Sequence, residues 1–146
     1  MLLVARLKIV VIIIVISAVM IGATIALYMH PISGDKVAYK YVTALGWEVE
    51  RIPVETINVK IPEKLGEVYA AYNQLQNAAG FDLEKVAGRI CERVTFIVKN
   101  FDGDDVRVNA LVYKGKVVGG DICSIKMDGF MLPLLSYEES IRERDD

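Results

Sequence analysis

A long apolar run near the N-terminus, from Ile9 to Tyr28, constrains this chain more than any other feature. It holds no charged residue, no amide side chain and no proline. A helix rises about 1.5 Å per residue, so this run measures roughly 30 Å, the thickness of the hydrocarbon core of a bilayer. We therefore predict a transmembrane helix here, with the lipid bilayer as its partner.

The charges around this run predict its orientation. Arg6 and Lys8 precede it, whereas all 19 acidic residues follow it. Because positive charge is retained on the cytoplasmic side, we expect a single-pass protein of the cell membrane with a cytoplasmic N-terminus. A cleaved signal peptide is the alternative, but its apolar part is usually only about 7–15 residues long. We expect the segment to be retained as an anchor.

The predicted organisation has three parts. Residues 1–30 form the anchor with a short cytoplasmic end, residues 31–134 an extracytoplasmic domain, and residues 135–146 a polar C-terminal tail. The part after the anchor has 15 basic and 19 acidic residues, a formal net charge of −4. Since it has no basic run with interleaved aromatic residues, we expect no nucleic-acid partner.

The extracytoplasmic part mixes helical and strand patterns. Apolar residues at spacings of three and four predict a helix over 63–79, and a shorter helix is predicted from Ser33 to Gly46. Alternation of apolar and polar residues predicts strands over 56–61, 93–99, 106–112 and 117–125. The fold class expected is α+β: a transmembrane helix, then a two-layer sandwich in which helices cover one face of an antiparallel sheet of four or five strands.

Pairing the predicted strands places the two cysteines. A tight turn at Lys114-Gly115 that pairs Val112 with Val117 puts Cys123 opposite Val106. Keeping the apolar residues on one face pairs Val98 with Val106, which puts Cys91 near Tyr113. The two cysteines are then at opposite ends and on opposite faces of the sheet. A disulfide needs Cα atoms within about 7 Å, so we predict none. An intermolecular bond through Cys91 remains open.

The most unusual local feature is Gly119-Gly120-Asp121, because paired glycines weaken a strand unless something requires them. The structural interpretation is a bulge or a close approach of the covering helix. The functional one is a groove where a ligand nears the backbone. The same pairing puts Asp121 on the face of Val106 and Val108, where it needs a partner. The candidate binding residues are those three and three of the long helix, Tyr72, Asn73 and Gln76.

No residue pattern in the chain indicates a catalytic or metal site. The lone histidine, His30, lies at the predicted membrane exit, and neither cysteine has a histidine nearby to activate it. Asn100 begins a stretch with calcium-loop spacing, but Asp105 stands where such a loop needs glycine. We expect no catalytic residue, no metal and no cofactor.

A series of short motifs, in this order and spacing, resembles a family of unknown function, domain of unknown function 4830. They are Ile61-Pro62, Tyr72-Asn73-x-Leu75-Gln76, Gly80-Phe81-Asp82-Leu83, Gly88, Asn100, Gly119-Gly120-Asp121 and Asp128-Gly129-Phe130. The resemblance covers the chain from about Gly46 to Leu134. It implies a small single-span protein of Gram-positive anaerobes and no known activity.

Three functional hypotheses remain. The leading one is a non-catalytic binding or interaction module at the cell envelope, with an envelope protein, a peptide or a cell-wall component as partner. The second is a carboxylate-based envelope hydrolase using Asp121 and Asp128, which requires carboxylates roughly 5–9.5 Å apart. The third is a structural subunit of a membrane assembly.

Overall fold

The computed structural model describes residues 16–17, 20, 33–101 and 105–145, and the chain divides into two compact units, Met1–Pro31 and Ile32–Asp146. The predicted span from Ile9 to Tyr28 lies outside the described residues except for Ile16, Ser17 and Met20, and so does His30. Among the helices formed by described residues, none has the length and apolar character needed to cross a membrane.

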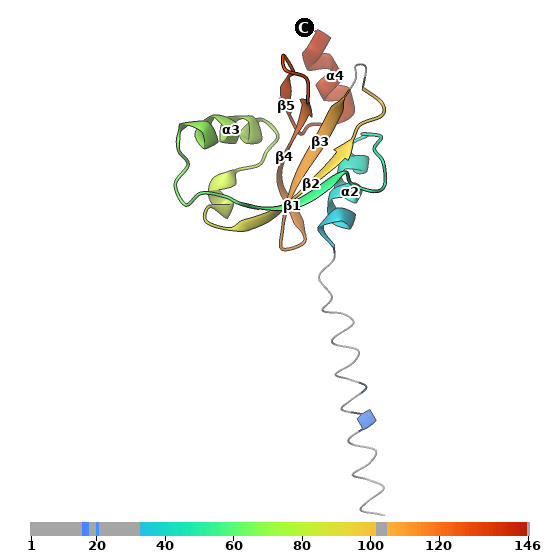
Figure 1. Ribbon diagram of the computed structural model, residues 1–146, viewed down its shortest axis with the longest axis vertical. Coiled ribbons are helices and arrows are strands. Elements are labelled where there is room, and N and C mark those ends of the chain that lie inside the picture. The colour runs from blue at the N-terminus through green and yellow to red at the C-terminus, as the bar shows by residue number, and fades with distance from the viewer. Residues whose placement is uncertain (1–15, 18–19, 21–32, 102–104, 146) are drawn as a thin grey trace, which may run out of the picture. The chain divides into compact units, whose positions relative to one another are not determined.

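The second unit is built on a five-stranded antiparallel sheet (Figure 1). Its strands follow one another in space as they do in sequence: β1 (Glu55–Lys60), β2 (Ile90–Ile97), β3 (Val106–Tyr113), β4 (Lys116–Ser124) and β5 (Met131–Pro133). The predicted α+β class and the strand count are confirmed. β1 and β5 are the two edge strands.

Three α-helices and one 3₁₀ helix accompany the sheet. They are α2 (Gly34–Ala44), α3 (Glu67–Ala78), η1 (Leu83–Val86) and α4 (Tyr137–Asp145). Ser33 stands at the N-terminus of α2, although its side chain makes no capping hydrogen bond. Asp82 does cap η1, because its carboxylate accepts a hydrogen bond from the Glu84 backbone. α2 and α3 lie within the two segments in which helical spacing predicted helices, although α3 begins at Glu67 and not at residue 63. α4 lies in the segment that was predicted to be a polar C-terminal tail.

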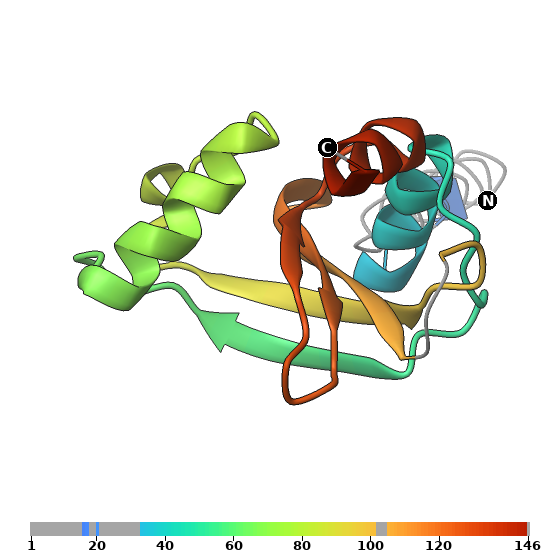
Figure 2. The same ribbon diagram turned by 90° about the horizontal axis from the view of Figure 1, so that it is seen from above.

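The helices cover both faces of the sheet, which corrects the prediction of a two-layer sandwich. On β3, Val108 and Ala110 pack in one hydrophobic cluster with α2, whereas Leu111 packs in a second cluster with Leu83 of η1. Neighbouring side chains of a strand point to opposite faces, so α2 and η1 lie on opposite sides. Figure 2 shows α3 on one side of β4 and β5, with α2 and α4 on the other. We call the side of Leu111 the α3 face.

A register shift between β3 and β4 decides which side chains reach the α3 face. The turn at Lys114-Gly115 pairs Tyr113 with Lys116, as predicted, but the pairing then slips by one residue beyond Val112. Asp121 therefore pairs with Asn109 instead of Val108. A slip of one residue moves every later side chain to the other face. The prediction that Asp121 shares a face with Val106 and Val108 was wrong for this reason.

The same shift changes the relation of the two cysteines. Cys123 pairs with Arg107 and thus shares the α3 face with Cys91, whereas opposite faces were predicted. They still lie at opposite ends of β3, roughly 20 Å apart along the strand. Both are free thiols, so the prediction of no disulfide between them is confirmed.

Candidate functional site

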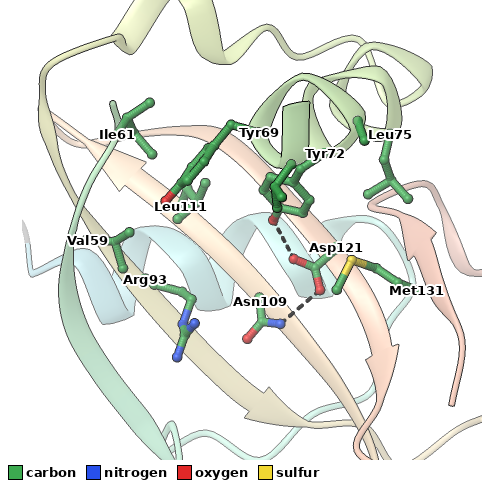
Figure 3. A pocket seen from close by; sticks show the side chains of 12 residues that line it. Val59, Ile61, Tyr69, Tyr72, Leu75, Arg93, Asn109, Leu111, Asp121 and Met131 are labelled. Atoms are coloured by element: carbon green, nitrogen blue, oxygen red, sulfur yellow. Dashed lines mark hydrogen bonds between the residues drawn. The ribbon is translucent and has the colours of Figure 1, made fainter. Parts of the chain in front are cut away.

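A groove of about 600 Å³ lies between α3 and the sheet, and we call it the α3 groove (Figure 3). Its walls come from α3, from the four strands β1 to β4 and from β5, and most of its lining side chains are apolar or aromatic. The lining residues are Val59, Ile61, Val68, Tyr69, Ala71, Tyr72, Leu75, Arg93, Asn109, Leu111, Asp121 and Met131.

The groove exists because α3 does not bury its apolar stripe, the pattern from which this helix was predicted, against the sheet. The two buried residues of α3 are polar, Asn73 and Gln76, and both lie in its C-terminal half. Val68, in its first turn, is 81% exposed. The helix is therefore attached to the sheet near its C-terminal end, and the stripe lines an open groove.

The floor of the groove carries a row of hydrogen-bonded polar side chains. Tyr72 donates its hydroxyl to one oxygen of Asp121 at 2.6 Å, and the Asn109 amide donates to the other at 2.9 Å. Thr95 donates in turn to the Asn109 carbonyl oxygen at 2.7 Å. Thr95, Asn109 and Asp121 pair directly across β2, β3 and β4, so the row crosses three strands and ends on α3.

Asp121 is buried, and its charge affects two neighbours. Burial, and then the negative charge of Asp121, raise the pKa of Tyr72 well above its usual value, so the hydroxyl stays protonated and remains a donor. Burial and the same charge raise the pKa of Cys123 to about 11. This thiol is therefore a poor nucleophile at neutral pH.

Arg93 is the cation of the groove, and its guanidinium is engaged elsewhere. It forms an ion pair with Glu55 on β1, at the outer edge of the sheet. Its Nε is sheltered from solvent and has no hydrogen-bond acceptor. Arg93 and Asp121 therefore share one groove without forming an ion pair with each other.

The two glycines of β4 allow neighbouring side chains to approach the strand closely. A Cβ on Gly119 would lie 2.9 Å from Oε1 of Gln76, and one on Gly120 would lie 2.4 Å from Cδ2 of Leu134. The Gln76 amide bonds both backbone groups of Gly120. Close approach of a helix and a neighbouring register shift, the two structural interpretations of this motif, are thus both present.

The structure brings together five of the six candidate binding residues and separates one. Tyr72 meets Asp121, and Gln76 meets Gly120, with Gly119 beside it. Asn73 faces η1 instead: its Oδ1 accepts from the Leu83 backbone at 2.7 Å and its Nδ2 donates to Asp82 at 3.1 Å. It holds η1 against α3 and does not line the groove.

Sequence reasoning missed several groove residues. Asn109 and Arg93 alternate with buried valines on β3 and β2, a pattern typical of a solvated face. The detectable signal was Leu111, a large apolar residue at the same parity as Asn109, which indicates that this face is covered too.

Other predicted features have different surroundings. Asp128 is exposed in the turn between β4 and β5 and does not line the groove, so Asp121 is the carboxylate among the described lining residues. The side-chain amide of Asn100 accepts a hydrogen bond from the Glu48 N–H and donates one to the Gly46 carbonyl oxygen. Within the described part of the chain, no three histidine, cysteine or acidic residues cluster as metal ligands.

Comparison with known proteins places the chain in a family. Searches of curated proteins and of solved structures give no significant match. A family match covers residues 41–122, more than half of the 146 residues, and includes α3, η1 and strands β1 to β3 with most of β4. The chain belongs to the family described as Domain of unknown function (DUF4830).

Proposed function

We propose that this protein is a non-catalytic binding module, tethered to the outer side of a cell membrane, whose α3 groove holds a ligand. The observation that carries this proposal is a groove of about 600 Å³ with apolar walls and a polar floor. Ligand sites in proteins are typically concave, mostly apolar and supplied with a few polar groups that orient the ligand.

Exposed apolar side chains at the rim support this proposal. Val68 on α3 is 81% exposed and Met131 on β5 is 51% exposed, and both line the groove. Covering apolar surface removes it from water at about 25 cal/mol per Å², so an occupant with an apolar body gains affinity here.

Two variants of α3 test whether the groove is the binding site. Ala71 lines the groove and Ala70 does not, and both are exposed. The full-length protein in detergent, immobilised, is exposed to envelope extract, and retained compounds and peptides are identified by mass spectrometry. Ala71→Trp fills the groove and is expected to abolish specific retention, whereas Ala70→Trp preserves it. Equal retention by both variants contradicts the proposal.

The tether is proposed from the apolar run alone, and it has its own test. Ala18 and Val19 lie at the middle of the run. One arginine at the centre of a membrane helix costs about 2.5–3.5 kcal/mol, so Ala18→Arg with Val19→Arg is expected to release the protein from membranes washed with carbonate. The matched control places two arginines at exposed positions of α3, Gln74 and Asn77. Continued membrane retention of the Ala18/Val19 variant contradicts the anchor.

A further inference from the structure

We infer that the ligand of the α3 groove is an apolar amine: an ammonium group on an apolar or aromatic body, with the ammonium seated on the Asp121 carboxylate. This inference rests on the proposed function and adds the chemical class of the ligand. It follows from the charges of the groove, from the partners of Asp121 and from the rings beside it.

The negative charge of Asp121 has no cationic partner among the described residues. Among the described residues, Arg93 pairs with Glu55 and Lys99 with Glu50, and neither of these ion pairs involves Asp121. The side chains that donate hydrogen bonds to Asp121 are Tyr72, Asn109 and the thiol of Cys123, and all three are neutral. Asp121 is only 3% exposed, so bulk water does little to stabilise its charge. A buried anion of this kind favours a cation beside it.

Arg93 does not supply that cation. Its guanidinium is committed to Glu55 on β1, which borders β2 on the side away from β3 and β4. Asp121 lies on β4, two strands in the opposite direction. The positive charge of Arg93 still acts on Tyr72, and that of Arg107 on Cys123, but neither arginine forms an ion pair with Asp121. A cationic ligand can therefore form the direct ion pair that Asp121 lacks.

The carboxylate also has room for a further donor. A carboxylate offers about four lone-pair positions; the hydroxyl of Tyr72, the amide of Asn109 and the thiol of Cys123 occupy three, so about one is left. An ammonium group brings three donors, so it can bond Asp121 through one of them while the existing hydrogen bonds persist. The row of polar side chains then acts as a fixed support that orients the acceptor.

Aromatic rings beside the carboxylate fit the same ligand. Tyr69 and Tyr72 both line the groove; Figure 3 shows Tyr72 reaching Asp121, Met131 close to that carboxylate and the ring of Tyr69 farther along the wall toward Leu111. An ammonium group placed over the face of an aromatic ring is stabilised by about 0.5–2 kcal/mol. The apolar side chains around the rings accommodate the rest of the ligand.

Three probes with one apolar body and different head groups test this inference: 2-phenylethylammonium, 2-phenylethanol and 3-phenylpropanoate. Binding to the full-length protein in detergent is followed by NMR of labelled methyl groups. Val59, Leu75 and Met131 report on the groove, whereas Val106 and Val108, in the cluster on the other face, serve as internal controls.

The ammonium probe is expected to shift the groove methyls and to bind at least about tenfold more tightly than the alcohol, because a hydrogen bond to a charged group is worth about 1.5–3 kcal/mol. Asp121→Asn keeps the size of the side chain, removes the charge and is expected to abolish that preference. Asp128→Asn, an exposed carboxylate outside the groove, is expected to retain it. The methyl spectra show whether each variant is folded.

The outcomes separate this inference from the proposed function. Equal binding of all three probes in the groove, unchanged in Asp121→Asn, overturns the amine and leaves a binding groove. Preferential binding of the phenylpropanoate, lost in Arg93→Gln, overturns it in favour of an anion. If no probe shifts the groove methyls, the amine inference fails, while the Ala71→Trp experiment independently decides the proposed function.

Discussion

The side-chain amide of Gln76 takes up both backbone hydrogen-bonding groups of Gly120. Its Oε1 accepts from the Gly120 N–H at 2.7 Å, and its Nε2 donates to the Gly120 carbonyl oxygen at 2.9 Å. β5 pairs with β4 only as far as Pro133, opposite Asp121. Gln76 therefore supplies the pair of hydrogen bonds that the next residue of a longer β5 would make, and it fastens α3 to the sheet.

Gln76→Ala is expected to lower the free energy of unfolding by about 2–4 kcal/mol, because it leaves a buried N–H and a buried carbonyl without partners. The measurement is urea denaturation followed by circular dichroism. Gln74, on the exposed side of the same helix, is the matched control, and Gln74→Ala is expected to change stability by less than about 0.5 kcal/mol. Equal effects of the two substitutions would show that the contact with Gly120 contributes nothing.

A side chain at Gly120 has no space. Its Cβ would lie 2.4 Å from Cδ2 of Leu134 and 2.5 Å from the backbone oxygen of Asn109, which cannot move without disturbing β3. Gly120→Ala is expected to destabilise the protein by about 1–3 kcal/mol. The control is Gly66→Ala, where a Cβ meets nothing within 4 Å. The stability of both variants is measured by thermal unfolding. A loss of stability in Gly66→Ala as large as that in Gly120→Ala contradicts the packing argument.

Much of this fold follows from local pattern. The tight turn at Lys114-Gly115 was predicted between two runs of alternating residues, and both turn residues have positive φ, 48° and 73°, which Gly115 adopts readily. The alternation in β2 and β3 gave their mutual register correctly, because pairing Val98 with Val106 puts the mostly apolar parity of each strand on one face. Local signals of this kind need no knowledge of distant contacts.

The position of Asp121 could not be predicted the same way. After Lys116, β4 runs Val117-Val118-Gly119-Gly120, where both parities are apolar or lack a side chain, so no pattern shows which residue is left out of the pairing. The apolar stripe of α3 was equally ambiguous, since a stripe that packs and a stripe that lines a groove look alike in sequence. In the structure α3 is held by its buried polar residues Asn73 and Gln76 and not by its apolar stripe. Their burial could not be predicted locally, because it depends on hydrogen bonds to the backbone of Leu83 and Gly120.

The stability of the protein is expected to fall more steeply above pH 10 because of Tyr72. Its pKa in the folded state is raised above the ordinary value of 10.0, mainly by burial and then by Asp121. Above pH 10 the Tyr72 hydroxyl of the unfolded chain loses its proton while that of the folded protein keeps it, so each further pH unit favours unfolding. Below pH 10 the stabilising contribution of Tyr72 is fully present. Urea denaturation of the protein and of Tyr72→Phe between pH 8 and pH 11 measures it. The variant should show a shallower decline, and parallel curves would refute the assignment.

Alkylation of Cys123 reports the charge of Asp121. With a pKa of about 11, raised by burial first and then by Asp121, about 1% of the thiol is ionised at pH 9, roughly 50-fold less than for a thiol of pKa 9.0. Iodoacetamide labelling, located by mass spectrometry, should be correspondingly slow. Asp121→Asn is expected to accelerate it only in part, because burial remains, whereas Asp128→Asn leaves the rate unchanged. An unaltered rate in Asp121→Asn means that no negative charge acts on Cys123.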